Sequence, residues 1–178
     1  MPDFINAPCN KPDGNCKKEG IVCKKTTRAL KFGLCDDGSD QKLPAYLDLF
    51  REDKWLATVE IPLGKDVTFK AVDFCVEILR NGNEPIKRCE GFLLYENKIC
   101  FIELKNRTYG RWLPDAREKF IETIQAFKQS YPNNEFEILE PVVSNRSCRT
   151  HQSLQVEKQK LKDAIGMEMQ LQSKIIIS

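Results

Sequence analysis

Two apolar segments joined by a short turn impose the strongest constraint on the fold of this chain. Residues 89–96 read CEGFLLYE and residues 98–104 read KICFIEL. The second segment is apolar at positions that point to both faces of a strand, and strands of this kind are usually central and covered on both sides. We therefore expect an α/β fold built around this hairpin.

The length and composition indicate one domain. The chain has 178 residues, of which 41% are hydrophobic and 30% are charged. That content supports a packed core. We expect a single domain over 1–178, with a core at about 54–146, a Cys- and Lys-rich N-terminal arm at 1–45 and a C-terminal extension at 147–178.

The charge and hydropathy patterns exclude some function classes and leave others open. Lys plus Arg total 28 and Asp plus Glu total 26, so bulk charge does not indicate a nucleic-acid partner and any basic surface must be local. No apolar run approaches the roughly 18–20 residues of a membrane span. The first 20 residues contain no apolar signal region. We expect a cytoplasmic protein with no membrane partner.

Periodicity and turn residues predict the other elements. A helix is expected to begin at Asp66, with Asp73 and Glu77 on its narrow polar stripe, and to end before Asn81. Pro141 predicts an edge or a bulge in a later strand. In chain order, the expected elements are a strand at 54–62, a helix at 66–80, the hairpin, a helix at about 115–130, a strand at 136–145, a helix at 154–166 and a strand at 167–177.

The hairpin is expected to gather charged side chains at its open end. If Glu96 and Asn97 form the turn, Glu90 lies opposite Glu103, and Lys105 shares their face. Cβ atoms of opposite residues lie about 4.5–5.5 Å apart, so the two carboxylates would repel each other. A divalent cation removes this repulsion. Hard oxygen ligands at this spacing suit Mg²⁺ or Mn²⁺, with waters in the remaining positions.

This arrangement resembles the PD-(D/E)XK, or restriction-endonuclease-like, superfamily. Glu90 begins one hairpin strand and Glu103-x-Lys105 ends the next, and the order of elements across residues 66–146 looks like the family's αβββαβ core. The resemblance implies a central mixed sheet flanked by helices. It also implies a nuclease that hydrolyses DNA phosphodiester bonds with Mg²⁺ or Mn²⁺. The family usually places Asp after Pro where this chain has Cys89-Glu90.

The resemblance implies roles for individual residues. Glu90, Glu103 and the carbonyl of Leu104 would hold the metal, and Lys105 would orient a water and offset charge on the phosphate. The family often adds an acid from the first core helix, for which Glu77 is preferred over Asp73.

Basic and aromatic residues flank the expected site and predict a nucleic-acid-binding rim. The alternative is a solvated loop whose tryptophan covers the core. The rim would contain Lys87, Arg88, Arg107, Tyr109, Arg111, Trp112 and Arg117.

The cysteines and the remaining function classes leave alternatives open. Cys75, Cys89 and Cys100 lie in apolar segments and are expected in the core. The N-terminal arm is expected to carry free thiols at Cys9, Cys16, Cys23 and Cys35. These cysteines lack the close sequence pairs of structural zinc sites, although a zinc-stabilised recognition module remains an alternative.

The main alternative to a nuclease is a catalytically silent protein of the same fold that binds nucleic acid or a partner protein. A homodimer is also compatible with the fold.

Overall fold

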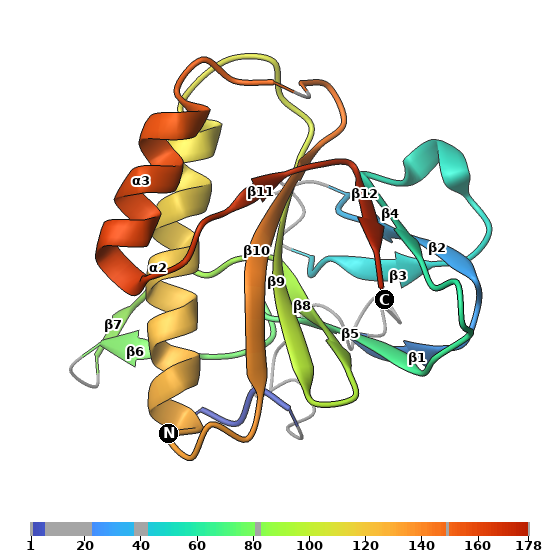
Figure 1. Cartoon of the computed structure of the whole chain (residues 1–178), viewed down its shortest axis with the longest axis horizontal. Coiled ribbons are helices and arrows are strands. Elements are labelled where there is room, and N and C mark those ends of the chain that lie inside the picture. The colour runs from blue at the N-terminus through green and yellow to red at the C-terminus, as the bar shows by residue number, and fades with distance from the viewer. Residues whose placement is uncertain (1, 6–22, 38–42, 81–82, 149, 178) are drawn as a thin grey trace.

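The computed structural model describes residues 2–5, 23–37, 43–80, 83–148 and 150–177. This part of the chain forms a mixed α/β protein with two helices, a six-stranded mixed sheet and a four-stranded sheet (Figure 1). The helices are α2 (Trp112–Ser130) and α3 (Leu154–Ile165). Neither of these described helices is long and apolar enough to cross a membrane.

The six-stranded sheet has the order β1-β5-β8-β9-β10-β11. The strands from β1 to β9 are antiparallel, whereas β10 runs parallel to both β9 and β11. The bounds are β1 (Lys24–Thr27), β5 (Val67–Ala71), β8 (Gly91–Tyr95), β9 (Lys98–Lys105), β10 (Glu137–Asn145) and β11 (Gln170–Leu171).

The four-stranded sheet has the order β12-β4-β2-β3 and lies on the side of the large sheet away from the helices (Figure 1). The described end of the chain therefore returns to pair with a segment from its first half. The bounds are β2 (Lys31–Cys35), β3 (Tyr46–Asp48), β4 (Ala57–Glu60) and β12 (Lys174–Ile176); a 3-10 turn η2 (Glu52–Lys54) and a short pair, β6 (Leu79–Arg80) and β7 (Glu84–Pro85), complete the described elements.

The apolar stripe of α2 packs on the central strands of the large sheet. The ring centroid of Phe127 in α2 lies 5.5 Å from that of Phe101 in β9 and 6.3 Å from that of Phe92 in β8, and both contacts are edge-to-face. Phe4, near the N-terminus, adds a fourth ring at 5.3 Å from Phe127. Offset and edge-to-face contacts are the favourable geometries for aromatic pairs. The cluster fixes α2, and with it every side chain that α2 presents to the hairpin.

The predicted hairpin and its register are confirmed. Tyr95 pairs with Lys98 and Gly91 pairs with Ile102, which is the register required to place Glu90 opposite Glu103. The bulge expected at Pro141 is also present, because the pairing of β10 with β9 shifts between Leu139 and Val142.

The helix expected at 66–80 is wrong. The chain forms β5 at Val67–Ala71, paired with β1 and β8, and then turns towards β6. An apolar run that is buried on most sides can form either a helix or a central strand. Here residues Val67–Ala71 form a strand, because they pair with β1 on one side and β8 on the other. Asp66, expected at the start of that helix, instead forms an ion pair with Arg28, with Oδ1 of Asp66 2.5 Å from Nε of Arg28.

The other elements follow the sequence with shifted ends. The strand expected at 54–62 is shorter, because η2 precedes β4. Helix α2 begins at Trp112, three residues before the expected start. The N-terminal arm is only partly an arm, since its described residues contribute β1 and β2 to the two sheets. The three cysteines expected in the core, Cys75, Cys89 and Cys100, are buried.

A buried carboxylate holds the four-stranded sheet together. Trp55 covers Gly33, where a Cβ atom would lie 1.9 Å from the indole ring, and the indole N–H donates to Asp48 at 2.9 Å. Backbone N–H groups of Arg51 and Phe50 also donate to Asp48. Burial alone would raise the pKa of Asp48, but these hydrogen bonds outweigh it and lower the pKa to about 2.

We expect Asp48→Asn to reduce the free energy of unfolding by about 2 kcal/mol at pH 7. Because the pKa of Asp48 is below its ordinary value of 3.8 in the folded chain, this stabilisation is complete above that value and is lost as the pH falls towards 2. Urea unfolding of both proteins between pH 2 and 7 measures the difference. Asp53→Asn, at an exposed position, is the control. A difference between wild type and Asp48→Asn that does not shrink on acidification contradicts the assignment.

Candidate functional site

Two buried glutamates meet at the open end of the hairpin. Glu90 immediately precedes β8, and Glu103 lies near the end of β9. The backbone N–H of Glu90 donates to Oε2 of Glu103 at 3.2 Å. Glu103 is fully buried, and Glu90 is 6% exposed. The two side chains that the sequence predicted to converge therefore lie side by side inside the protein.

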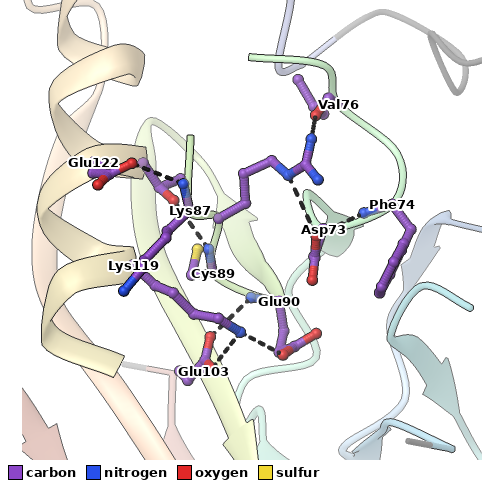
Figure 2. Close-up of polar contacts among 11 residues, drawn as sticks. Asp73, Phe74, Val76, Lys87, Cys89, Glu90, Glu103, Lys119 and Glu122 are labelled. Atoms are coloured by element: carbon purple, nitrogen blue, oxygen red, sulfur yellow. Dashed lines mark hydrogen bonds and ion pairs between the residues drawn. The ribbon is translucent and has the colours of Figure 1, made fainter. Parts of the chain in front are cut away.

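Two lysines balance the charge of these carboxylates. Nζ of Lys105 lies 2.6 Å from Oε1 of Glu103. Nζ of Lys119, from α2, lies 2.7 Å from the same oxygen and 3.2 Å from Oε1 of Glu90. Figure 2 shows Lys119 reaching from the helix to both carboxylates. Two carboxyl groups, of Glu90 and Glu103, and two ammonium groups, of Lys105 and Lys119, thus form one compact buried cluster.

Burial and neighbouring charges act strongly on the protonation of this cluster. Burial and the adjacent carboxylate of Glu103 raise the pKa of Glu90 to about 8, although Lys119 acts in the opposite direction. Burial alone would lower the pKa of Lys119, but the carboxylates of Glu103 and Glu90 outweigh it and raise the pKa above its ordinary value. Lys119 is therefore held as an ammonium ion.

The cluster opens onto a pocket of about 350 Å³ between the ends of the two sheets and α2. The pocket is lined by both carboxylates and cations, and the carboxylates of Asp36 and Asp73 add to the rise in the pKa of Glu90. The lining residues are Asp36, Asp37, Leu56, Asp73, Phe74, Glu90, Leu104, Lys105, Asn106, Arg107 and Lys119.

One wall of the pocket is a strained turn after β5. Phe74 has a φ of 61°, which is uncommon for a bulky residue and costs of order 1–3 kcal/mol. Its backbone N–H donates to Oδ1 of Asp73 at 3.0 Å, and the same oxygen accepts from Nε of Arg88 at 3.3 Å (Figure 2). Arg88 also donates to the carbonyl of Val76. Arg88 therefore supports the wall of the pocket and does not extend into solvent as predicted for the rim.

The structure brings most of the predicted metal site together but not all of it. Glu90, Leu104 and Lys105 line the pocket, and Glu103 lies directly behind them. Glu77 is exposed and does not line the pocket, whereas Asp73 does. The preference for Glu77 rested on a helix at 66–80, and the turn that replaces this helix leaves Asp73 at the pocket and Glu77 exposed.

Three cations of the predicted nucleic-acid rim share one carboxylate, that of Glu118. Glu118 forms ion pairs with Lys87, with Arg117 at 3.2 Å and with Arg111 at 3.9 Å. Trp112, also predicted for the rim, is 2% exposed and belongs to the core. For Trp112 alone, burial in the core agrees with the alternative expected from the sequence.

Arg107 differs from the other rim residues because it is exposed and lines the pocket. Within the part of the chain that the structure describes, no carboxylate forms an ion pair with it. The side chain of Asn145, at the end of β10, accepts from the backbone N–H of Arg107 at 3.3 Å and donates to its carbonyl at 2.7 Å. Asn145 is 1% exposed, so the loop that carries Arg107 is held from inside the protein.

Sequence reasoning missed Lys119. It lies on α2 three residues after Ala116 and four before Thr123, both of which are buried. A lysine at this spacing stands on the apolar side of its helix. A charged residue on an apolar stripe was the available signal, because a buried ammonium needs a partner.

The site offers oxygen donors of the kind that magnesium and manganese prefer. Glu90 and Glu103 offer carboxylate oxygens, and Mg²⁺ is commonly held by one or two carboxylates with waters completing its shell. Across the described ranges, no three His, Cys, Asp or Glu side chains gather in a way that could hold a metal ion. Of the arm cysteines considered for zinc, Cys9 and Cys16 lie outside the described residues.

Comparison of the chain with protein-family models, with curated proteins and with solved structures finds no match.

We expect Glu103→Ala to lower the free energy of unfolding by about 3–5 kcal/mol, because it leaves the ammonium groups of Lys105 and Lys119 without their shared partner. Glu118→Ala is a matched control, since Glu118 also faces several cations but is partly exposed. Its expected cost is about 1 kcal/mol or less. Chemical unfolding of the three proteins measures both values, and equal costs would show that burial of Glu103 is not what makes it important.

Proposed function

We propose that this chain is a metal-dependent nuclease that hydrolyses phosphodiester bonds in DNA. The observation that supports this most directly is the buried Glu90–Glu103 pair with Lys105, which opens onto a polar pocket. Charged groups buried at the end of a central strand destabilise the fold unless they are paired, and they are typical of functional positions.

The proposed fold is a variant of the αβββαβ core of the PD-(D/E)XK superfamily. The order β5, β8, β9, α2 and β10 follows the βββαβ part of that core. No α-helix precedes β5 among the described residues, so the acid that the family often takes from its first helix has no counterpart there. Asp73, in the turn after β5, is the acid that we assign to the pocket instead of Glu77.

The pocket residues suggest how the reaction would proceed. Mg²⁺ or Mn²⁺ held by Glu90, Glu103 and the Leu104 carbonyl would supply Lewis-acid chemistry, polarising the phosphate and lowering the pKa of a nearby water. In the hydrolysis, a water oxygen would bond to phosphorus as the bond to the leaving sugar oxygen breaks, and a proton lost by the water would be balanced by one gained by that sugar oxygen. Lys105, a compact positive charge, stabilises the negative charge that develops on the phosphate.

Arg107 is the residue that we assign to binding the DNA backbone. Its side chain is exposed at the pocket, and Asn145 fixes its backbone. Arginine suits phosphate because its planar group donates two parallel hydrogen bonds. Contacts of this kind position a strand without reading its sequence.

We expect Glu103→Gln and Lys105→Met each to reduce cleavage of plasmid and single-stranded DNA by at least about 100-fold, because each removes a group acting at the phosphate. Gel assays with Mg²⁺ or Mn²⁺ measure the rates, and chelation of the metal should abolish them. Glu135→Gln, at an exposed position beyond the end of α2, is the control. Undiminished cutting by either site variant would show that these residues do not form the active site.

We expect Arg107→Ala to raise KM about tenfold with little change in kcat, since a phosphate contact made equally before and during reaction contributes to binding alone. Steady-state cleavage of a labelled oligonucleotide separates the two constants. Arg28→Ala removes an arginine that is paired with Asp66 outside the pocket and serves as the control. An unchanged KM in Arg107→Ala would remove Arg107 from the binding site.

A catalytically silent nuclease-fold protein that binds nucleic acid or a partner protein is the second candidate. It is favoured by the two ammonium groups that already neutralise the carboxylates, and by Glu90 at a position where the resemblance leads us to expect Asp. Calorimetric titration with Mn²⁺ distinguishes the two functions. Absence of binding at millimolar Mn²⁺ favours the silent protein.

A further inference from the structure

We propose that Lys119 is a built-in counter-ion that occupies the cation position between Glu90 and Glu103 and competes with a divalent metal for it. Lys119 would then set the affinity of the site for the metal. This inference rests on the proposed metal site, and it concerns a residue outside the motif that suggested the function.

The contacts of Lys119 are those of a bridging cation. Its Nζ lies 2.7 Å from an oxygen of Glu103 and 3.2 Å from an oxygen of Glu90 (Figure 2). These two carboxylates belong to adjacent strands and would otherwise repel each other inside the protein. A single ammonium touching both therefore takes the place that a metal ion would need.

The charge balance explains why the two cations exclude each other. Glu90 and Glu103 carry at most two negative charges, and Lys105 with Lys119 already supplies two positive charges at contact distance. A divalent ion added to these four groups would leave an excess of at least two positive charges among them. Such an excess is unfavourable at low dielectric, so one ammonium must move away when the metal binds.

Lys119 is the ammonium that a metal between the two carboxylates would displace. Among the residues that the structure describes, Lys105, on β9, forms an ion pair with Glu103 alone, whereas Lys119, on α2, forms one with each glutamate. Both side chains line the pocket and are similarly exposed, 17% for Lys105 and 20% for Lys119. The flexible four-carbon stem of Lys119 can turn outwards without any change in the hairpin.

The test is Mn²⁺ binding by wild type and Lys119→Met, measured by calorimetry and by the change in Tm on adding Mn²⁺. We expect the variant to have a lower Tm than wild type without metal, because two buried carboxylates lose their bridge. We also expect it to bind Mn²⁺ at least about tenfold more tightly and to show a larger rise in Tm, since no ammonium has to be displaced. A lysine with a merely structural role would lower Tm without raising metal affinity.

The same substitution at an exposed lysine on the same helix, Lys128→Met, is the control and should change neither value. Lys119→Gln, which keeps a hydrogen-bond donor without the charge, repeats the test if Lys119→Met does not fold. If both variants fail to fold without metal, recovery of the folded protein on refolding with Mn²⁺ supports the inference. Failure to recover overturns it.

The remaining outcomes separate this inference from the proposed nuclease. Unchanged or weaker Mn²⁺ binding in a folded Lys119 variant overturns the inference and leaves the nuclease to be judged by its own cleavage assay. Tighter binding in the variant supports the inference even if wild type cuts no DNA, in which case the nuclease proposal fails alone. Mn²⁺ that binds neither wild type nor variant overturns the inference.

Discussion

The carboxylate of Glu103 is the group on which the arrangement of this protein depends. It is fully buried in β9, the strand that joins the antiparallel and parallel halves of the large sheet. A charge in this position is tolerated only with partners, and these come from two elements: Lys105 on the same strand and Lys119 on α2. The helix and the sheet are therefore linked by charge as well as by the aromatic cluster around Phe127.

The second sheet determines how the buried charges reach solvent. Asp36 follows β2 of the four-stranded sheet, and it lines the same pocket as Glu90 and Lys119. Ser144 of β10 donates to the carbonyl of Leu56, which holds the two sheets together next to this pocket. The site is consequently built at a junction of two sheets and a helix. Such junctions are common positions for binding sites, because each layer contributes side chains to one concave space.

The sequence predicted the parts of the site that depend on local pairing. A two-residue turn fixes the register of a hairpin, so the meeting of Glu90 with Glu103 followed from position alone. The strand at Val67–Ala71 was mistaken for a helix, because a run buried on most sides lacks the alternation that marks a half-exposed strand. Because of that error, Glu77 was assigned to the expected site as an acid from the first core helix. Lys119 was missed because its partners lie on a hairpin 16 or more residues away in the chain.

The balance of charge in this cluster has a consequence for how function could arise in the fold. A metal site made only of acids would be strained whenever the metal is absent, since its carboxylates repel each other. Lys119 removes that strain, and it raises the work required to bind a metal by the energy of its own two ion pairs. The same residue would therefore stabilise the metal-free protein and lower its affinity for a metal. In the proposed nuclease, the strength of the Lys119 contacts with Glu90 and Glu103 would therefore set how readily the site takes up its metal.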